Sequence, residues 1–116
     1  MDKMVLVDAG IDYDGGLKRC LNDTSLYERV LCKFPGDKSY SKIVEALESA
    51  DAKAAFEAAH TLKGVSANLG LTDLYDSVFP LVEELRNASD TGGAAPLMPS
   101  VTSNYERVIK ALEAAQ

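Results

Sequence analysis

Several residue types are scarce in this 116-residue chain, and each scarcity excludes a class of protein. Tryptophan is absent, histidine occurs once, as His60, and the two cysteines are Cys20 and Cys32. No run of about 18 apolar residues occurs, so no membrane-spanning helix is predicted. The first residues also lack the charged and then apolar pattern of a signal segment. We therefore expect a cytoplasmic protein that neither spans a membrane nor is exported by a signal.

One histidine and two cysteines offer few ligands for a metal ion. No second histidine and no acidic cluster at ligand spacing accompany His60, so we predict neither a metal site nor another cofactor in this chain. Reduced thiols are what a cytoplasmic location implies for Cys20 and Cys32, although the sequence alone leaves a disulfide between them open.

Positive charge is also in the minority. The chain holds 12 lysines and arginines against 18 aspartates and glutamates, which gives a net charge of -6 at pH 7. Nucleic acids and anionic membrane surfaces are polyanions, so neither is an expected partner. The apolar fraction of 47% is ordinary for a globular protein, and the length corresponds to one domain. We predict a single, monomeric domain over residues 1–116 that docks on other proteins.

Most of the apolar segments repeat with the 3.6-residue period of a helix. Capping and stopping residues separate them, among them Pro35, Gly36, Asp51 and Gly70. The predicted helices cover residues 13–21, 25–34, 38–49, 52–69, 72–87 and 100–114. Short connections between successive helices predict an all-α, antiparallel four-helix bundle with additional short helices at its N-terminal end. The first two helices are expected to cap the bundle formed by the other four.

Three segments depart from this simple pattern. Residues 4–7 form a short apolar run that is compatible with a strand, and we expect it to pack on the bundle because it is too isolated to found a sheet. Thr72 is expected to cap helix 72–87, and Pro80 inside that helix is expected to kink or split it. Residues 88–99 contain two glycines and two prolines and are predicted to be the one long loop.

The helix predicted at residues 52–69 has two contrasting faces. At about 100° per residue, one face collects small and apolar side chains and should be buried. Its members are Ala52, Ala55, Ala59, Leu62, Ser66 and Leu69. The opposite face carries Lys53, Glu57, His60, Gly64, Ala67 and Asn68. His60 is therefore predicted to point to solvent, with Lys63 and Phe56 at the border of its face.

Lys63 and Gly64 follow His60 by three and four residues, on the turn whose side chains lean back toward it. A lysine there can bring its ammonium near any group that His60 carries. A glycine in mid-helix costs about 1 kcal/mol relative to alanine, and access to the imidazole would explain that cost. Each of the three residues alone would be an ordinary surface residue, but their combination on one patch indicates a function.

The predicted patch suits modification of His60 by another protein. Acid–base catalysis normally needs a pocket, and a convex face of small residues offers none. No nucleophile–histidine–carboxylate set is recognisable in the sequence either. Imidazole is itself a nucleophile near neutral pH, and Lys63 would offset the charge of a phosphoryl group as a point cation. Transient phosphorylation therefore fits the patch best.

The sequence around His60 resembles the histidine-containing phosphotransfer (HPt) domain family. The resemblance rests on His60-x-Leu62-Lys63-Gly64, on Asn68-Leu69-Gly70 after it and on Ala58-Ala59 before it. Weaker similarities lie upstream, from Gly10-Ile11-Asp12 to Leu26-Tyr27, and downstream in residues 71–85. Together they cover roughly residues 8–113.

The resemblance implies a phosphoryl carrier without kinase activity of its own. His60 would accept a phosphoryl group from the aspartyl phosphate of a receiver domain and pass it to the aspartate of another receiver. Lys63 would be the charge partner of the phosphoryl group, and Gly64 would give clearance. The partners would be receiver domains of response regulators or hybrid histidine kinases, and the receiver would supply the magnesium ion.

Two other readings of the sequence remain open. The first is a helical adaptor that binds receiver-like or other signalling proteins without phosphotransfer. The second is the dimerisation and phosphoacceptor domain of a sensor kinase, which we rank lower. That family places an acidic residue directly after its histidine, where this chain has Thr61, and 116 residues leave no room for an ATP-binding segment.

Overall fold

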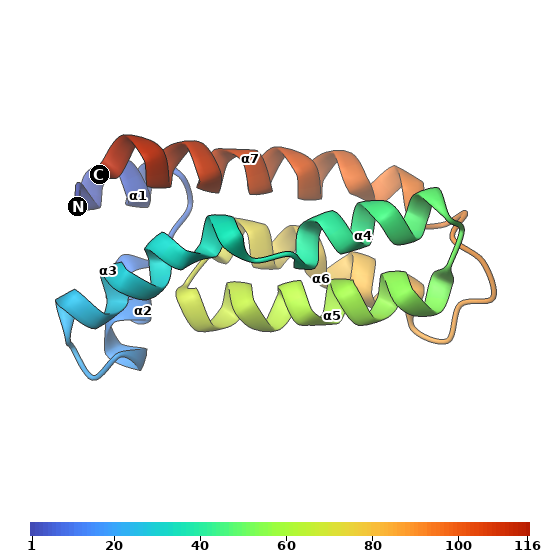
Figure 1. Cartoon of the computed structure of the whole chain (residues 1–116), viewed down its shortest axis with the longest axis horizontal. Helices are drawn as coiled ribbons and strands as arrows, with labels where there is room; N and C mark the ends of the chain where they lie inside the picture. Colours follow the sequence, from blue (N-terminus) through green and yellow to red (C-terminus); the bar gives the residue numbers. More distant parts are fainter.

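The computed structural model describes all of residues 1–116 and contains helices but no strands. Figure 1 shows how the helices are arranged along the long axis of the molecule. The α-helices are α1 (Lys3–Asp8), α2 (Tyr13–Arg19), α3 (Thr24–Lys33), α4 (Ser39–Glu48), α5 (Ala52–Leu69), α6 (Thr72–Leu85) and α7 (Met98–Ala115). Two short 3-10 turns are η1 (Phe34–Gly36) and η2 (Ala95–Leu97). The predicted all-α fold class is confirmed.

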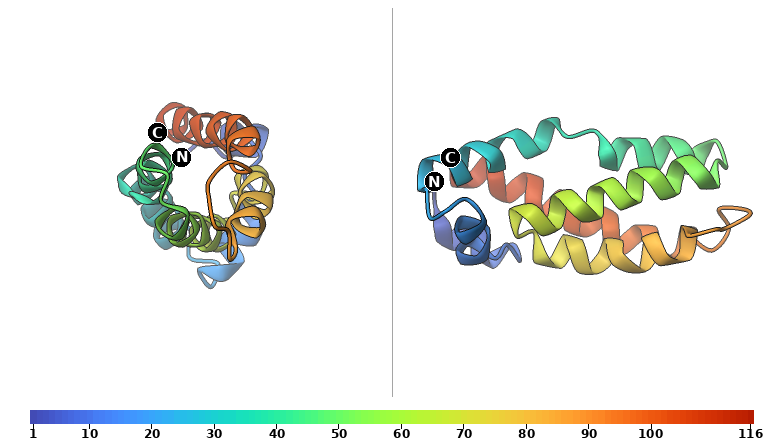
Figure 2. Two further views of the ribbon diagram at one scale, coloured as in Figure 1. Left: turned by 90° about the vertical axis from the view of Figure 1, so that its right-hand side faces the viewer. Right: turned by 90° about the horizontal axis from the view of Figure 1, so that it is seen from below.

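Four helices, α4 to α7, form the bundle. Viewed along its axis, they surround a common centre, and successive helices run in opposite directions (Figure 2). Each helix contributes one apolar stripe to a single core, as the amphipathic pattern predicts. The largest fully buried bundle side chains include Ile43, Leu62, Leu74, Leu81 and Leu112.

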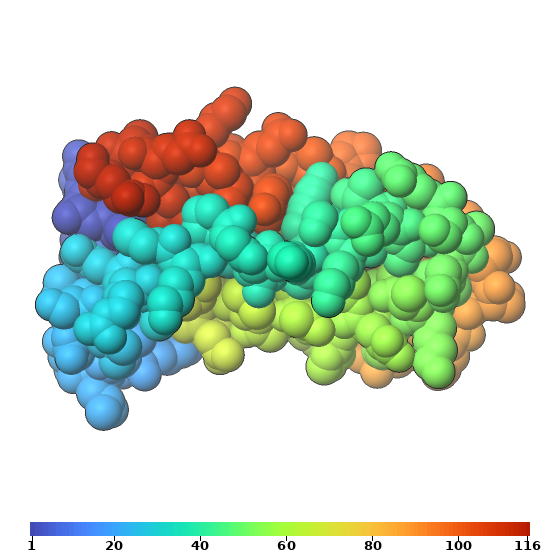
Figure 3. Space-filling view, in the orientation of Figure 1, coloured from blue at the N-terminus to red at the C-terminus, as the bar shows by residue number.

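The short helices α2 and α3 lie at one end of the bundle, as predicted (Figure 1). From α3 the chain passes through η1 into α4, and the two helices follow one another along one broad face of the molecule (Figure 3). The stop predicted at Pro35 and Gly36 is the 3-10 turn η1, and Asp37 then accepts a hydrogen bond from the Ser39 amide at the start of α4.

Residues 4–7 are helical, so their compatibility with a strand was misleading. They lie inside α1, which packs against α7 as an N-terminal segment on the bundle. The carboxylate of Asp2 accepts hydrogen bonds from the amides of Met4 and Val5, at 3.1 and 3.4 Å. This cap satisfies amides at the start of α1 that have no partner within the helix, and it explains why so short a run is helical.

Helix α6 differs from its prediction at both ends. Its N-cap residue is Leu71, and Thr72 is already the first helical residue, so Thr72 does not cap the helix. The helix continues through Pro80 without being split and ends at Leu85. Pro80 is exposed, while its neighbours Leu81 and Val82 are fully buried. Packing of that inner face outweighs the one backbone hydrogen bond that proline removes, and the freed carbonyl can be solvated.

The loop predicted at residues 88–99 lies two residues earlier in the structure, at residues 86–97. Its last part forms η2, and α7 begins at Met98 instead of at residue 100. Proline is well tolerated in the first turn of a helix, so Pro99 lies in the first turn of α7 where the sequence pattern suggested a loop. Cys20 and Cys32 are free thiols. None of the seven helices combines the length and the apolar composition that crossing a bilayer requires.

Candidate functional site

Both ends of α5 are fixed by local hydrogen bonds. At its start the Asp51 carboxylate accepts a hydrogen bond from the Ala54 amide at 3.0 Å. At its end Gly70 adopts a left-handed conformation with φ of 73°, and the Leu71 amide donates to the Ser66 carbonyl at 2.9 Å. The predicted bounds and the predicted stop at Gly70 are confirmed, because both signals are local and unambiguous.

The two predicted faces of α5 are present. Ala55, Ala59, Leu62 and Ser66 are buried, and Ala58 joins them, while His60 and Gly64 are exposed. Lys63 is half-buried at the border between the two faces. The structure therefore brings the three predicted site residues together on one open stretch of α5, in contact with α6.

The His60 imidazole has an aromatic neighbour, Phe56, on the side that faces the start of α5. The Phe56 ring lies one turn earlier on the same helix, with its centroid 5.9 Å from that of the imidazole. The Arg86 guanidinium, just after α6, lies 5.3 Å from the centroid of the Phe56 ring. Arg86 also forms an ion pair with Glu83 at 3.3 Å, so its charge is already partly offset.

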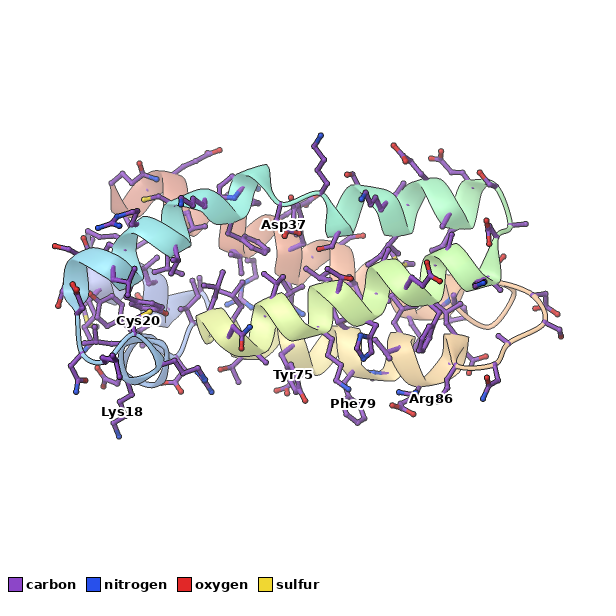
Figure 4. All side chains as sticks on the ribbon, turned by 60° about the horizontal axis from the view of Figure 1, so that its bottom comes forward. Lys18, Cys20, Asp37, Tyr75, Phe79 and Arg86 are labelled. Carbon is purple, nitrogen blue, oxygen red and sulfur yellow. The ribbon has the colours of Figure 1, made fainter.

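Lys63 reaches across to α6. Its ammonium lies 4.7 Å from the centroid of the Phe79 ring, a distance typical of a cation–π contact. Lys63 takes part in none of the four ion pairs of the structure. Figure 4 shows Tyr75, Phe79 and Arg86 following one another along the α6 side of this surface. The lysine charge is thus held close to the helix and is not neutralised by a carboxylate.

Neither packing nor backbone conformation within this chain requires glycine at position 64. Its φ is not positive, and a Cβ atom added to it would have no neighbour within 4 Å apart from its own helix. Alanine would therefore fit and would favour the helix by about 1 kcal/mol. The space over Gly64 is open to solvent, next to His60.

The open surface limits what the site can do alone. The largest groove of the molecule lies between α4 and α5; it includes Glu57 and Thr61 but not His60. No group of three or more histidine, cysteine, aspartate or glutamate side chains is placed to hold a metal ion. The imidazole can act as a nucleophile toward an incoming group, with an unpaired lysine three residues later on its helix and without a substrate cleft around it.

Sequence reasoning placed Phe56 near His60 but missed Phe79 and Arg86. Phe79 carries a usable signal, because it is a large apolar residue outside the buried stripe of α6, which is formed by Leu74, Val78, Leu81, Val82 and Leu85. A ring off the apolar stripe of an amphipathic helix remains at the surface and can contact another molecule or a neighbouring polar group. Arg86 carries no such signal.

Comparison with known proteins bears on the same stretch of chain. A family model described as Hpt domain matches residues 37–115, which is more than half of the chain. The upstream similarities in residues 8–36 lie outside this match. No curated protein and no solved structure matches the chain. The chain therefore belongs to the Hpt domain family, whose members carry phosphoryl groups in phosphorelay signalling, are not kinases and interact with receiver domains.

Proposed function

We propose that this protein is a phosphorelay intermediate that carries the phosphoryl group on His60. The donor is the aspartyl phosphate of one receiver domain, and the acceptor is the aspartate of another. The observation that carries the proposal is the exposed imidazole of α5, followed three residues later on the same helix by a lysine whose ammonium has no carboxylate partner. Membership of the Hpt domain family supports the same chemistry.

The transfer step needs a nucleophile from this chain and the remaining groups from the receiver. The distal ring nitrogen of His60, Nε2, forms a bond to phosphorus while the bond between phosphorus and the aspartyl oxygen breaks. The receiver carboxylate leaves with the electron pair of that bond. Transfer to the second receiver reverses these roles. The receiver supplies the magnesium ion.

Lys63 and Gly64 assist this step in different ways. A phosphoryl group on His60 brings negative charge to the surface, and the Lys63 ammonium offsets it. Gly64 keeps the space beside the imidazole clear for the receiver active site. The absence of any neighbour around an added Cβ supports this role, because no contact within the chain explains the glycine.

We also propose that residues 1–116 act as one monomeric domain in the cytoplasm. The packing of α1 on α7, and of α2 and α3 on α5, supports a single unit. The free thiols of Cys20 and Cys32 are consistent with a reducing compartment.

Replacement of His60 by glutamine tests the proposed phosphoacceptor. The wild-type chain should be labelled when mixed with a radiolabelled, phosphorylated receiver domain, and the bond should be acid-labile and base-stable. H60Q should keep its helical circular dichroism and lose all labelling, because the nucleophilic nitrogen is gone. Glu57→Gln, on the same exposed face one turn earlier, is the matched control and should be labelled normally.

The same experiment distinguishes the alternative function. Full labelling of H60Q would reject His60 as the phosphoacceptor. Binding of receiver domains by the wild-type chain without labelling from any of them would support the helical adaptor instead.

A further inference from the structure

Phe79 occupies an unusual position on α6. It is 43% exposed, although it is one of the largest apolar residues of the chain. Neighbouring apolar residues of the helix, such as Val78 and Leu81, are fully buried. Burial in the core therefore does not explain Phe79. Its ring centroid lies 6.2 Å from that of Tyr75 and 4.7 Å from the Lys63 ammonium.

The Lys63 ammonium and the Arg86 guanidinium are held in different ways. The Arg86 guanidinium contacts the Phe56 ring and also the Glu83 carboxylate. The Lys63 ammonium contacts the Phe79 ring and has no carboxylate within 4 Å. A ring attracts an ammonium through its quadrupole but carries no net charge. Phe79 can thus fix the place of the lysine head group while leaving its positive charge uncompensated.

We propose that Phe79 is a positioning residue, whose ring holds the Lys63 ammonium at the His60 face, ready for a phosphoryl group. This inference rests on the proposed function. A free lysine side chain samples many rotamers, and holding it near the reaction site removes part of the entropy lost when it meets the phosphoryl group. A carboxylate in the place of the ring would hold the ammonium too, but it would compete with the phosphoryl group for it.

The contact itself can be tested without any phosphotransfer. In NMR spectra of the free protein, the Hε and Cε resonances of Lys63 should show the ring-current shift of an aromatic neighbour. Phe79→Leu should abolish that shift, and Phe79→Tyr, which keeps a ring, should retain it. Tyr75→Leu is a graded comparison: the Tyr75 ring lies 6.2 Å from that of Phe79 and has no cation over it, so Y75L should shift the Lys63 resonances less than F79L does. Unchanged Lys63 resonances in F79L would overturn the proposal.

The consequence for transfer is tested by a double-mutant cycle. F79L should slow phosphoryl transfer from a receiver about two- to fivefold, the effect expected of one exposed cation–π contact. F79L should not slow transfer further when Lys63 is already alanine, because a positioning residue acts only through the group it positions. F79Y should restore the wild-type rate.

Two outcomes of the transfer measurement are decisive. An equal effect of F79L with and without Lys63 would overturn the proposal, because Phe79 would then act on the receiver directly. Failure of the wild-type chain to be labelled at all would overturn the proposed function. That failure would leave the NMR result intact, so the two proposals fail in different measurements.

Discussion

Gly16 and Gly64 lie in opposite surroundings, at the closed end of the bundle and on the open His60 face. A Cβ atom on Gly16 would overlap the ring of Tyr27, so α2 and α3 can approach each other only with glycine there. A Cβ atom on Gly64 would meet nothing within 4 Å. The comparison shows that one glycine is explained by packing inside the chain and the other is not. The reason for Gly64 must therefore be sought in another molecule.

The closed end, formed by α2, α3 and the last turn of α5, is also tied by hydrogen bonds. The Tyr27 hydroxyl donates to the Leu69 carbonyl at 2.7 Å, and the Asp12 amide donates to the Gly70 carbonyl at 2.7 Å. Burial raises the pKa of Tyr27, so its hydroxyl stays protonated as a donor well into the alkaline range. On the His60 face the side chains contact rings and solvent instead.

The largest expected effect is on the closed end. Gly16→Ala should lower the free energy of unfolding by about 2–3 kcal/mol, because overpacking against Tyr27 outweighs the gain in helix propensity. Urea denaturation followed by circular dichroism measures it. Gly64→Ala is the control and should raise stability by up to about 1 kcal/mol. Equal stability of the two variants would remove the contrast between the regions.

The next effect concerns access on the open face. Gly64→Leu should slow phosphoryl transfer about 30-fold, equivalent to about 2 kcal/mol of steric conflict with the receiver, while the fold keeps its stability. The rate is measured by mixing the chain with a phosphorylated receiver, stopping the reaction at set times and counting the label on each protein. Gly64→Ala should slow transfer less than Gly64→Leu does. If G64L transfers as fast as the wild-type chain, the clearance argument for Gly64 is wrong.

A smaller effect on the transfer rate is expected when the positive charge of Lys63 is removed. Lys63→Ala should slow transfer about tenfold, because a charge-assisted contact to the phosphoryl group contributes about 1.5 kcal/mol. Lys53→Ala, on the exposed face of α5 nearly three turns before Lys63, serves as the control for loss of one positive charge. Unchanged rates in K63A would show that Lys63 is an ordinary surface lysine.

The smallest effect is expected for Tyr27, where a substitution should change the stability of the fold but not the rate of phosphoryl transfer. Tyr27→Phe should lower the free energy of unfolding by about 1 kcal/mol, since it removes the hydrogen bond to the Leu69 carbonyl and keeps the ring. The transfer rate should not change, because Tyr27 is buried away from the His60 face. A slower transfer in Y27F would mean that the closed end controls the open face.

Local signals account for the parts of the fold that were predicted well. The bounds of α5 follow from Asp51, Gly70 and the apolar spacing between them, and the same spacing places His60 outside. Errors arose where two local signals compete. Pro80 and Pro99 both suggest the end of a helix. Pro80 lies inside α6, whose inner face is held by packing in the core, and Pro99 lies in the first turn of α7, where proline is tolerated.

The sequence by itself determined an all-helical bundle, the helix that carries the single histidine and the side of that helix on which the histidine lies. These properties depend on residues a few positions apart. Only the tertiary structure decided that Phe79 of α6 lies under the Lys63 ammonium and that Arg86 lies over Phe56. Such pairs depend on how two helices are rotated and shifted against each other, which is fixed by packing of their buried faces and not by the pattern of either helix alone.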